Sequence, residues 1–355
     1  MTKRKHSLEE VLDHVLDNGP RSIRELGVRL WIDEAEELIL ALSKRGMKLK
    51  PYDFPNTGNV WVTSNDSLIL YRRLATKQLI SAVSRKAGVD YRRVEGFKEI
   101  LPKLGVAAFK KEPINEWGTT LGGLLTFYHN SNIQPVLELV KNDPGFILIK
   151  SRNLQPYDFP KSPNNFWKDR AGKPTETARK AAKQLIFHLA KKLKVRGFTL
   201  DGFKEILPHL TYETFCNEVI NDWGTTLDGL VHVYNNSPSA VVLDLIEKDS
   251  DFKEIRRIGL QPYDFNSPKQ YWTDETGQPT AMARAATGQL IRHMAEKLGL
   301  DLSTPEGLKE VLAKTGKSKF YHEGINDWGT TLGGMFQTAY NRSVRTAVSD
   351  HLSNS

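Results

Sequence analysis

The chain has little of what membrane, secreted or redox proteins rely on. It contains one cysteine, Cys216, and no run of about 18 apolar residues. A single thiol excludes an internal disulfide and any site built from several cysteines, and it fits a reducing compartment. The start, MTKRKHSLEEVLDH, has no apolar core, so no secretory signal is expected. We therefore expect a cytoplasmic protein without membrane-spanning segments.

Motifs of common catalytic sites are also missing. The chain has no Gly-x-x-x-x-Gly-Lys-Ser/Thr loop and no His-Glu-x-x-His motif, and none of its nine histidines recurs in all three copies. We therefore expect no metal, no other cofactor and no enzymatic activity. Recurring carboxylates at Asp53, Asp158 and Asp264 could serve a nuclease metal, but roles in turns explain them more simply.

What the chain does have is strong internal repetition. The string WGTTLGG at Trp117 returns as WGTTLDG at Trp223 and as WGTTLGG at Trp328, at offsets of 106 and 105 residues. The strings PYDF and GFKEIL (GLKEVL the third time) keep the same spacing. A shared offset over about 80 residues identifies three copies of one module. The expected parts are an N-terminal domain and three repeats, at residues 1–64, 65–150, 151–256 and 257–355.

Helical periodicity dominates each copy. In copy two, apolar residues spaced by three and four predict a long helix that Thr175 caps and that ends near Lys194. Further on, the pattern predicts a helix from Leu227, a tight polar turn, and a second helix from Pro238. PYDF and the tryptophan after it predict a β-hairpin. The expected fold class is mainly α with small β-hairpins, built as tandem helix-turn-helix or winged-helix-like repeats.

The N-terminal region shows a similar order of elements. Residues 7–16 predict one helix, Ser22 caps a second and Asp33 caps a third, and residues 47–54 and 59–63 predict two strands. This arrangement resembles a winged helix-turn-helix DNA-binding domain. The strings GLLxxYxNS and PYDF, with the following tryptophan, resemble a loosely defined family of tandem repeats that pairs PWxF and YW hairpins with GLLxxYxxSP helices. That resemblance implies nucleic-acid binding, although PYDF and WGTT depart from the family pattern.

Positive charge is concentrated in copy one. The chain has 50 basic and 42 acidic residues, a net charge of +8 and a pI near 9.3. Residues 67–172 alone hold 17 basic and 9 acidic residues, again +8. Basic side chains gather on the long helix, where they could neutralise backbone phosphates. A solvated helix face is the alternative. The predicted phosphate contacts are Arg72, Arg73, Lys77, Arg179, Lys180, Lys183 and Arg284.

Side chains at the start of the second helix of each helix pair are the predicted readers of bases. They differ between the copies, as expected of modules that read different base pairs, although drift of surface residues would look the same. Asn or Gln would favour adenine and Arg would favour guanine. These residues are Asn132, Gln134, Ser237, Ser239, Arg342, Ser343 and Arg345.

Two further sets of residues are identical in all copies. The paired threonines of WGTT are expected to cap the next helix, and could also present hydroxyls to a phosphate. They are Thr119, Thr120, Thr225, Thr226, Thr330 and Thr331. The WGTT tryptophans are expected in the core. The glutamines Gln78, Gln184 and Gln289 are expected to make a buried hydrogen bond to a neighbouring loop.

These features predict a site-specific double-stranded DNA-binding protein, a transcriptional regulator of bacterial or phage type associated with the nucleoid. Tandem copies would replace two-fold symmetry, so a monomer could bind an extended site. One alternative is an RNA-binding repeat protein that stacks bases on Tyr128, Tyr234 and Tyr340. The other is a protein-interaction scaffold without catalysis.

Overall fold

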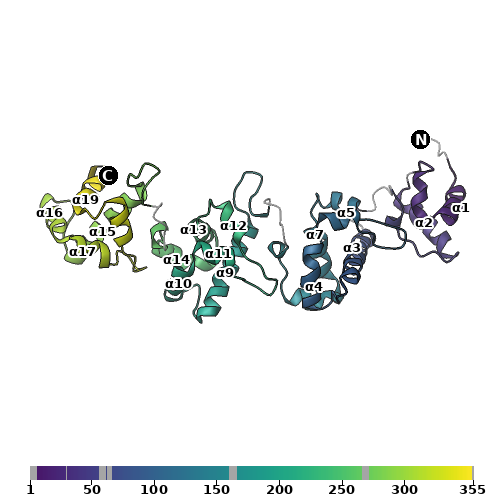
Figure 1. The fold of residues 1–355 in the computed structure, drawn as a ribbon, viewed down its shortest axis with the longest axis horizontal. Coiled ribbons are helices and arrows are strands. Elements are labelled where there is room, and N and C mark those ends of the chain that lie inside the picture. The colour runs from purple at the N-terminus through teal and green to yellow at the C-terminus, as the bar shows by residue number, and fades with distance from the viewer. Residues whose placement is uncertain are drawn as a thin grey trace. The chain divides into compact units, whose positions relative to one another are not determined.

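The protein is described here by a computed structural model, which covers residues 6–28, 30–55, 61, 66–159, 166–265 and 272–353, with the backbone alone at 66–68. The chain divides into two compact units, unit one at residues 1–163 and unit two at residues 164–355 (Figure 1). The finer division into four parts stays a prediction.

Unit one is built from helices and short 3₁₀ turns. Its α-helices are α1 (Leu8–Asn18), α2 (Ile32–Ser43), α3 (Asp66–Ala87), α4 (Val94–Ile100), α5 (Val106–Lys111), α6 (Gly122–Phe127), α7 (Ile133–Asn142) and α8 (Ile147–Ser151). Its 3₁₀ turns are η1 (Pro20–Arg24), η2 (Pro51–Asp53), η3 (Leu101–Lys103), η4 (Pro144–Phe146) and η5 (Pro156–Asp158).

Unit two repeats this type of architecture. Its α-helices are α9 (Glu176–Leu193), α10 (Leu200–Ile206), α11 (Tyr212–Asn217), α12 (Asp228–Val233), α13 (Pro238–Lys248), α14 (Lys253–Ile258), α15 (Ala281–Leu298), α16 (Pro305–Lys314), α17 (Lys317–His322), α18 (Gly333–Ala339) and α19 (Val344–Ser353). Its 3₁₀ turns are η7 (Leu207–His209), η8 (Ser250–Phe252) and η9 (Pro262–Asp264). The expected mainly helical fold is therefore confirmed.

The long helix of each copy packs against the helix that closes the copy: α3 against α7, α9 against α13, and α15 against α19. In copy two, Leu185 and Leu189 of α9 and Val242 and Leu245 of α13 are buried. Each such side chain stabilises the fold by roughly 1.5–3 kcal/mol when it leaves water. The apolar spacing that predicted these helices thus marks their packed faces.

Several local predictions are confirmed. The Thr175 hydroxyl accepts a hydrogen bond from the Ala178 amide at 3.2 Å and caps α9. α13 begins at Pro238, as expected from the fixed φ of proline. In the turn before each closing helix, Asn130, Asn236 and Asn341 have φ of 63°, 61° and 45°. These left-handed conformations are ones that asparagine tolerates.

The predicted β-hairpin wings are not borne out among the described residues. Pro51–Asp53 forms a 3₁₀ turn instead of part of a strand, because the Lys50 amide donates a 2.8 Å hydrogen bond to the Asp53 carboxylate and closes the turn. Residues 56–60 and 62–65 of the predicted hairpin lie outside the described residues. Pairing of the strand type is limited, in the described part of the chain, to the single bridges Lys168–Pro174 and Thr273–Pro279.

The N-terminal region also differs from its predicted helices. The second expected helix is only the 3₁₀ turn η1, which Gly19 and Pro20 start and after which Gly27 turns left-handed with φ of 65°. The third, α2, begins after Trp31 and not after Asp33. The core of the region is nevertheless the expected one, with Ile23, Leu38 and Leu42 buried together.

Candidate nucleic-acid interface

One predicted phosphate contact of each long helix forms an ion pair within its own copy. Arg73 pairs with Glu138 at 3.5 Å, Arg179 with Asp244 at 3.5 Å, and Arg284 with Asp350 at 3.7 Å. In every case the arginine lies on the long helix and the acid on the closing helix of the same copy. The pair therefore fixes the packing of the two helices, and its arginine is already neutralised.

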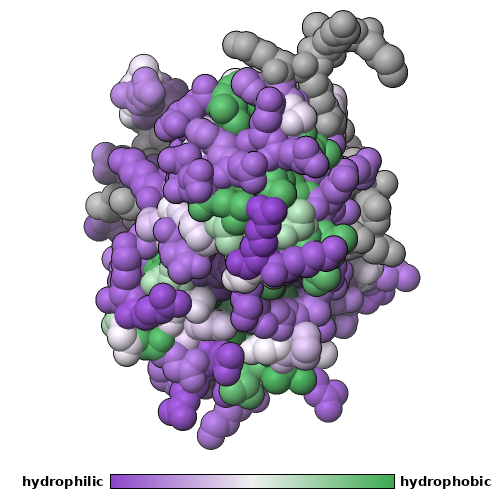
Figure 2. Space-filling model, turned by 90° about the vertical axis from the view of Figure 1, so that its right-hand side faces the viewer, coloured by the Kyte–Doolittle hydropathy of each residue, from purple (hydrophilic) through white to green (hydrophobic). Residues whose placement is uncertain are grey.

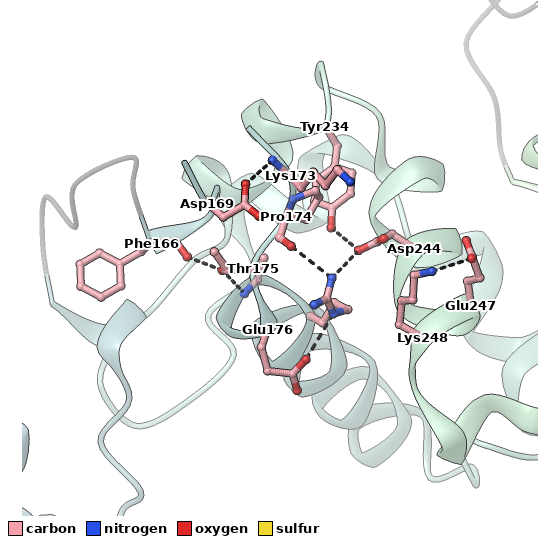
Figure 3. A network of polar contacts seen from close by, with 12 residues as sticks. Phe166, Asp169, Lys173, Pro174, Thr175, Glu176, Tyr234, Asp244, Glu247 and Lys248 are labelled. Atoms are coloured by element: carbon pink, nitrogen blue, oxygen red, sulfur yellow. Dashed lines mark hydrogen bonds and ion pairs between the residues drawn. The ribbon is translucent and has the colours of Figure 1, made fainter. Parts of the chain in front are cut away.

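A tyrosine completes each of these clusters. The hydroxyls of Tyr128, Tyr234 and Tyr340 donate to the same carboxylates, at 2.7 Å for Tyr234 and 2.9 Å for Tyr340. Figure 3 shows the Tyr234 and Asp244 side chains pointing at each other. Burial, followed by the hydrogen bond to the acid, raises the pKa of each tyrosine. These phenols remain neutral, and they are committed to packing.

The neighbouring lysines are paired as well. Lys77 lies 2.8 Å from Asp143, and Lys183 lies 2.8 Å from Asp249 and 2.6 Å from Asp251. Burial opposes the charge of Lys183, but its hydrogen bonds to the two aspartates raise its pKa overall. Most of the charge of these lysines is therefore balanced within the copy.

Two residues of the predicted set behave differently. Arg72 is buried, donates a 3.0 Å hydrogen bond to the Trp61 carbonyl oxygen, and lies 4.4 Å from the centre of the Phe127 ring. Lys180 is exposed and makes no hydrogen bond or ion pair with a residue that the structure describes. Of the seven predicted phosphate contacts, the structure leaves only Lys180 uncommitted.

The WGTT threonines do not cap a helix. The residue before α6 is Leu121, and no side chain caps that helix. The Thr119 hydroxyl donates instead to Asp53 at 2.8 Å, and Asn115 donates to the same oxygen at 2.6 Å. Copy three repeats both contacts, from Thr330 at 2.5 Å and Asn326 at 2.6 Å to Asp264. Thr225 is buried, whereas Thr120, Thr226 and Thr331 are more exposed.

These contacts explain why PYDF and WGTT recur together. Burial raises the pKa of the Asp53 carboxyl, while hydrogen bonds from the Lys50 amide, Thr119 and Asn115 oppose that rise. The aspartate ties its own 3₁₀ turn to the WGTT loop. The glutamine prediction is confirmed in the same region, because the Tyr52 hydroxyl donates to Gln78 at 3.0 Å and Tyr263 contacts Gln289. Trp223 and Trp328 are buried, as expected of core residues.

Only part of the predicted base-reading set faces solvent. The Asn132 amide donates to the Leu104 carbonyl oxygen at 2.8 Å. The Ser237 and Ser239 hydroxyls lie 3.0 Å apart, and Ser239 is buried. The Ser343 hydroxyl accepts from the Thr346 amide at 3.2 Å. The exposed members are Gln134, Arg342 and Arg345.

The surface of α2, in the region that resembles a winged helix-turn-helix domain, is acidic. α2 carries Asp33, Glu34, Glu36 and Glu37, and its exposed apolar residue Leu40 is 62% exposed. Figure 2, which faces the α1–α2 end of Figure 1, shows a hydrophobic area inside a hydrophilic rim. Carboxylates placed beside phosphates repel them. The acidic run IDEAEE was visible in the sequence and argues against this helix as a groove reader.

One group of exposed cations lies near the C-terminal ends of α3 and α9 and in the segments that follow them, including α4. We call the residues Arg85, Arg92, Lys98, Lys191, Lys194 and Arg196 the helix-end cations. All six are exposed, and none forms an ion pair with a residue that the structure describes. Copy three lacks the second group, since Glu296, Gly299 and Asp301 stand where copy two has Lys191, Lys194 and Arg196. The basic residues themselves are visible in the sequence. Their helical spacing does not show which of them meet an acid in the fold.

Other kinds of site find no support in the described part of the chain. Within it, no group of three or more His, Cys, Asp or Glu residues could hold a metal ion. No described helix combines the length and apolarity needed to cross a membrane. No known protein family, curated protein or solved structure matches this chain. The resemblances to a winged helix and to a repeat family therefore stay predictions.

Proposed function

We propose that this protein binds double-stranded DNA, and that the helix-end cations of copies one and two hold the phosphate backbone. The observation that carries the proposal is the contrast in pairing along each long helix. Arg73, Lys77, Arg179 and Lys183 have carboxylate partners within their copy, whereas the helix-end cations are exposed and form no ion pair with a described residue. The division is not strict, because Lys180 is exposed and unpaired and because Lys86 and Lys192 near the helix ends pair with Glu112 and Glu218. Unpaired cations that meet phosphates release condensed counterions, which drives binding at low salt.

Base recognition in this proposal is limited to three residues. Gln134 at the start of α7 would favour adenine, and Arg342 and Arg345 around the start of α19 would favour guanine. Copy two has no exposed reader among the predicted residues, because Ser237 and Ser239 are engaged with each other. We therefore expect strong phosphate contacts and a modest preference for sequence, contributed by copies one and three.

The pairing of the tyrosines argues for duplex over single-stranded RNA. An RNA-binding mode would stack unpaired bases on exposed aromatic rings. Tyr128, Tyr234 and Tyr340 were the rings proposed for this, and each is engaged with the acid of its own copy. A scaffold role has one observation in its favour, the acidic and apolar surface of α2. That role becomes the leading hypothesis if no nucleic acid binds at low salt.

Fluorescence anisotropy with labelled duplex DNA, single-stranded DNA and RNA, measured over a salt series, tests the proposal. The triple variant Lys191→Ala, Lys194→Ala, Arg196→Ala should bind duplex more weakly and lower the salt slope by roughly 0.9 for each phosphate that is no longer neutralised. The matched control is Lys253→Ala, Lys309→Ala, Lys317→Ala, which removes the same charge from exposed positions of unit two. Equal weakening by both variants would show that net charge, and not this surface, causes binding.

A further inference from the structure

A pocket in unit one joins the N-terminal region to copy one. It has a volume of about 300 Å³ and is formed by η1, the PYDF turn and the WGTTLGG loop. η1 contributes Arg21 and Arg24, and the loop contributes Thr119, Thr120 and Gly123. A volume of this size lies at the lower end of the range for small-molecule sites.

The walls of this pocket are held by contacts on every side. Asp53 at its base accepts hydrogen bonds from Thr119 and Asn115, and its other oxygen accepts from the Lys50 amide. The Trp61 ring is stacked on Tyr52 at 5.9 Å, with 14° between the ring planes. The site is therefore shaped before any ligand arrives, which reduces the entropy cost of binding.

The charge in the pocket favours an anion. Arg21 donates to the Gly118 carbonyl oxygen, which aims its guanidinium along the loop. Arg24 is exposed, and its guanidinium has no ion pair or hydrogen bond to a described residue. The one acid among the lining residues, Asp53, has its oxygens occupied by donors, and burial raises its pKa. The Thr120 hydroxyl also lines the pocket and is not used by another described residue.

We propose that this pocket binds a phosphoryl group, with Arg24 and Arg21 as the charged donors and Thr120 as a hydroxyl donor. Guanidinium groups match phosphate oxygens in geometry and charge, and they donate in pairs. The stacked Trp61 ring offers an apolar wall for the organic part of a phosphorylated compound. The source of the phosphoryl group is either a free compound of mononucleotide size or a phosphate of bound DNA.

Because the proposed site depends on Arg21 and Arg24, we expect it beside copy one and not beside the other copies. Arg21 and Arg24 belong to the region that precedes the first copy. In unit two, the equivalent tryptophan of copy three, Trp328, packs against Phe203 of α10, with ring centres 6.0 Å apart. The tryptophan of this loop thus meets an aromatic ring of α10 in copy three, whereas the arginine-bearing turn η1 lies beside the loop of copy one. The WGTT loop of copy three is therefore expected not to bind a phosphoryl group, and it serves as a control within the same chain.

Calorimetry with inorganic phosphate and with AMP tests the free-compound source on the full chain. Wild type should bind one of these probes saturably at one site per chain, and Arg24→Ala should weaken binding at least about tenfold. Arg93→Ala removes an exposed arginine of the same unit that belongs neither to the pocket nor to the helix-end cations, and it should leave probe binding unchanged.

A second pair of variants separates the pocket from general charge. A Cβ added at Gly123 would lie 3.0 Å from the Trp61 indole nitrogen, whereas one added at Gly334 in copy three would meet nothing within 4 Å. Gly123→Ala should therefore weaken probe binding and Gly334→Ala should not. Circular dichroism melts of both variants report any loss of fold.

Short duplex DNA is the second probe, and it tests whether the phosphoryl group belongs to a DNA backbone. Weaker duplex binding by Arg24→Ala and Gly123→Ala, without binding of phosphate or AMP, assigns the site to a backbone phosphate. The proposal is overturned if neither variant changes binding of phosphate, AMP or duplex. That result leaves the helix-end cations untouched, because their variants lie elsewhere in the chain.

Discussion

Lys183 and Lys191 lie about two turns apart on α9, yet they face different surroundings. Lys183 meets Asp249 and Asp251 of its own copy, whereas Lys191 is exposed and forms no ion pair with a described residue. The same division holds in copy one between Lys77 and Arg85. Residue type and helix position therefore do not reveal whether a cation is available. The acids brought close by the fold decide it.

We expect the largest loss of stability from removing Asp244, the acid that pairs with Arg179 in the first turn of α9. Asp244→Ala leaves Arg179 and the Tyr234 hydroxyl without their shared acceptor. We expect the free energy of unfolding of unit two to fall by about 2 kcal/mol, less than for a fully buried pair because both side chains keep some exposure. Hydrogen exchange of the α9 and α13 amides measures this. Glu205→Ala, an exposed acid on α10, is the control and should have little effect.

Low pH should weaken a second cluster of ion pairs, the one around Glu323 in copy three. Hydrogen bonds from Lys297 and Lys319, aided by His293, lower the pKa of Glu323 to about 2. A pKa lowered on folding means that this pairing stabilises the protein above about pH 4.5 and is lost as pH falls toward 2. Glu323→Gln should cost about 1 kcal/mol at neutral pH, because the lysines are partly solvated.

Urea unfolding followed between pH 5 and pH 2 checks this expectation. The stability difference between wild type and Glu323→Gln should shrink as pH falls through that range. A difference that stays constant down to pH 2 would contradict the assigned pairing.

Replacing Lys183 and Lys191 of α9 with alanine, one at a time, tests the comparison directly. Lys183→Ala should lower stability by about 1 kcal/mol and leave duplex affinity nearly unchanged. Lys191→Ala should do the reverse, with unchanged stability and a salt slope lower by roughly 0.9. Thermal melts and anisotropy on the same preparations give both readouts. If the two variants change both readouts alike, the division between paired and free cations has no functional meaning.

The smallest expected effect is a gain in affinity for duplex DNA. Glu296 of copy three stands where copy two has Lys191, and Glu296→Lys would place a cation at that position. Duplex affinity should rise a few-fold at low salt, with a salt slope steeper by about 0.9. Glu310→Lys, elsewhere in copy three, controls for the change in net charge. An equal rise for both variants would refute a defined surface.

Sequence patterns predicted the local features well. The Thr175 cap and the start of α13 at Pro238 follow from preferences acting over a few residues. One predicted strand differs for a local reason too, since Pro51 and the Asp53 carboxylate favour a tight turn, while residues 56–60, 62–65, 160–165 and 266–271 of the predicted hairpins lie outside the described residues. Helix caps and tight turns depend on residues that are adjacent in the sequence, so their geometry can be predicted from it.

Long-range pairing was the part that the sequence did not make evident. Arg179 and Asp244 are 65 residues apart, and nothing in the helical pattern around Arg179 indicates an acid on α13. A usable signal did exist, because each copy has an acid ten residues after a tyrosine, at Glu138, Asp244 and Asp350. Aligning the copies for recurring acids, and not for cations alone, would have identified these clusters.

The Arg179–Asp244 pair also bears on how the chain is made. It joins the first turn of α9 to the middle of α13, so the acid that completes this cluster is the last of its members to leave the ribosome. A nascent chain that ends before residue 238 has Arg179 and Tyr234 but not their carboxylate. Domains acquire their structure as units during synthesis. A chain stopped short of α13 therefore lacks the helix against which the apolar face of α9 packs.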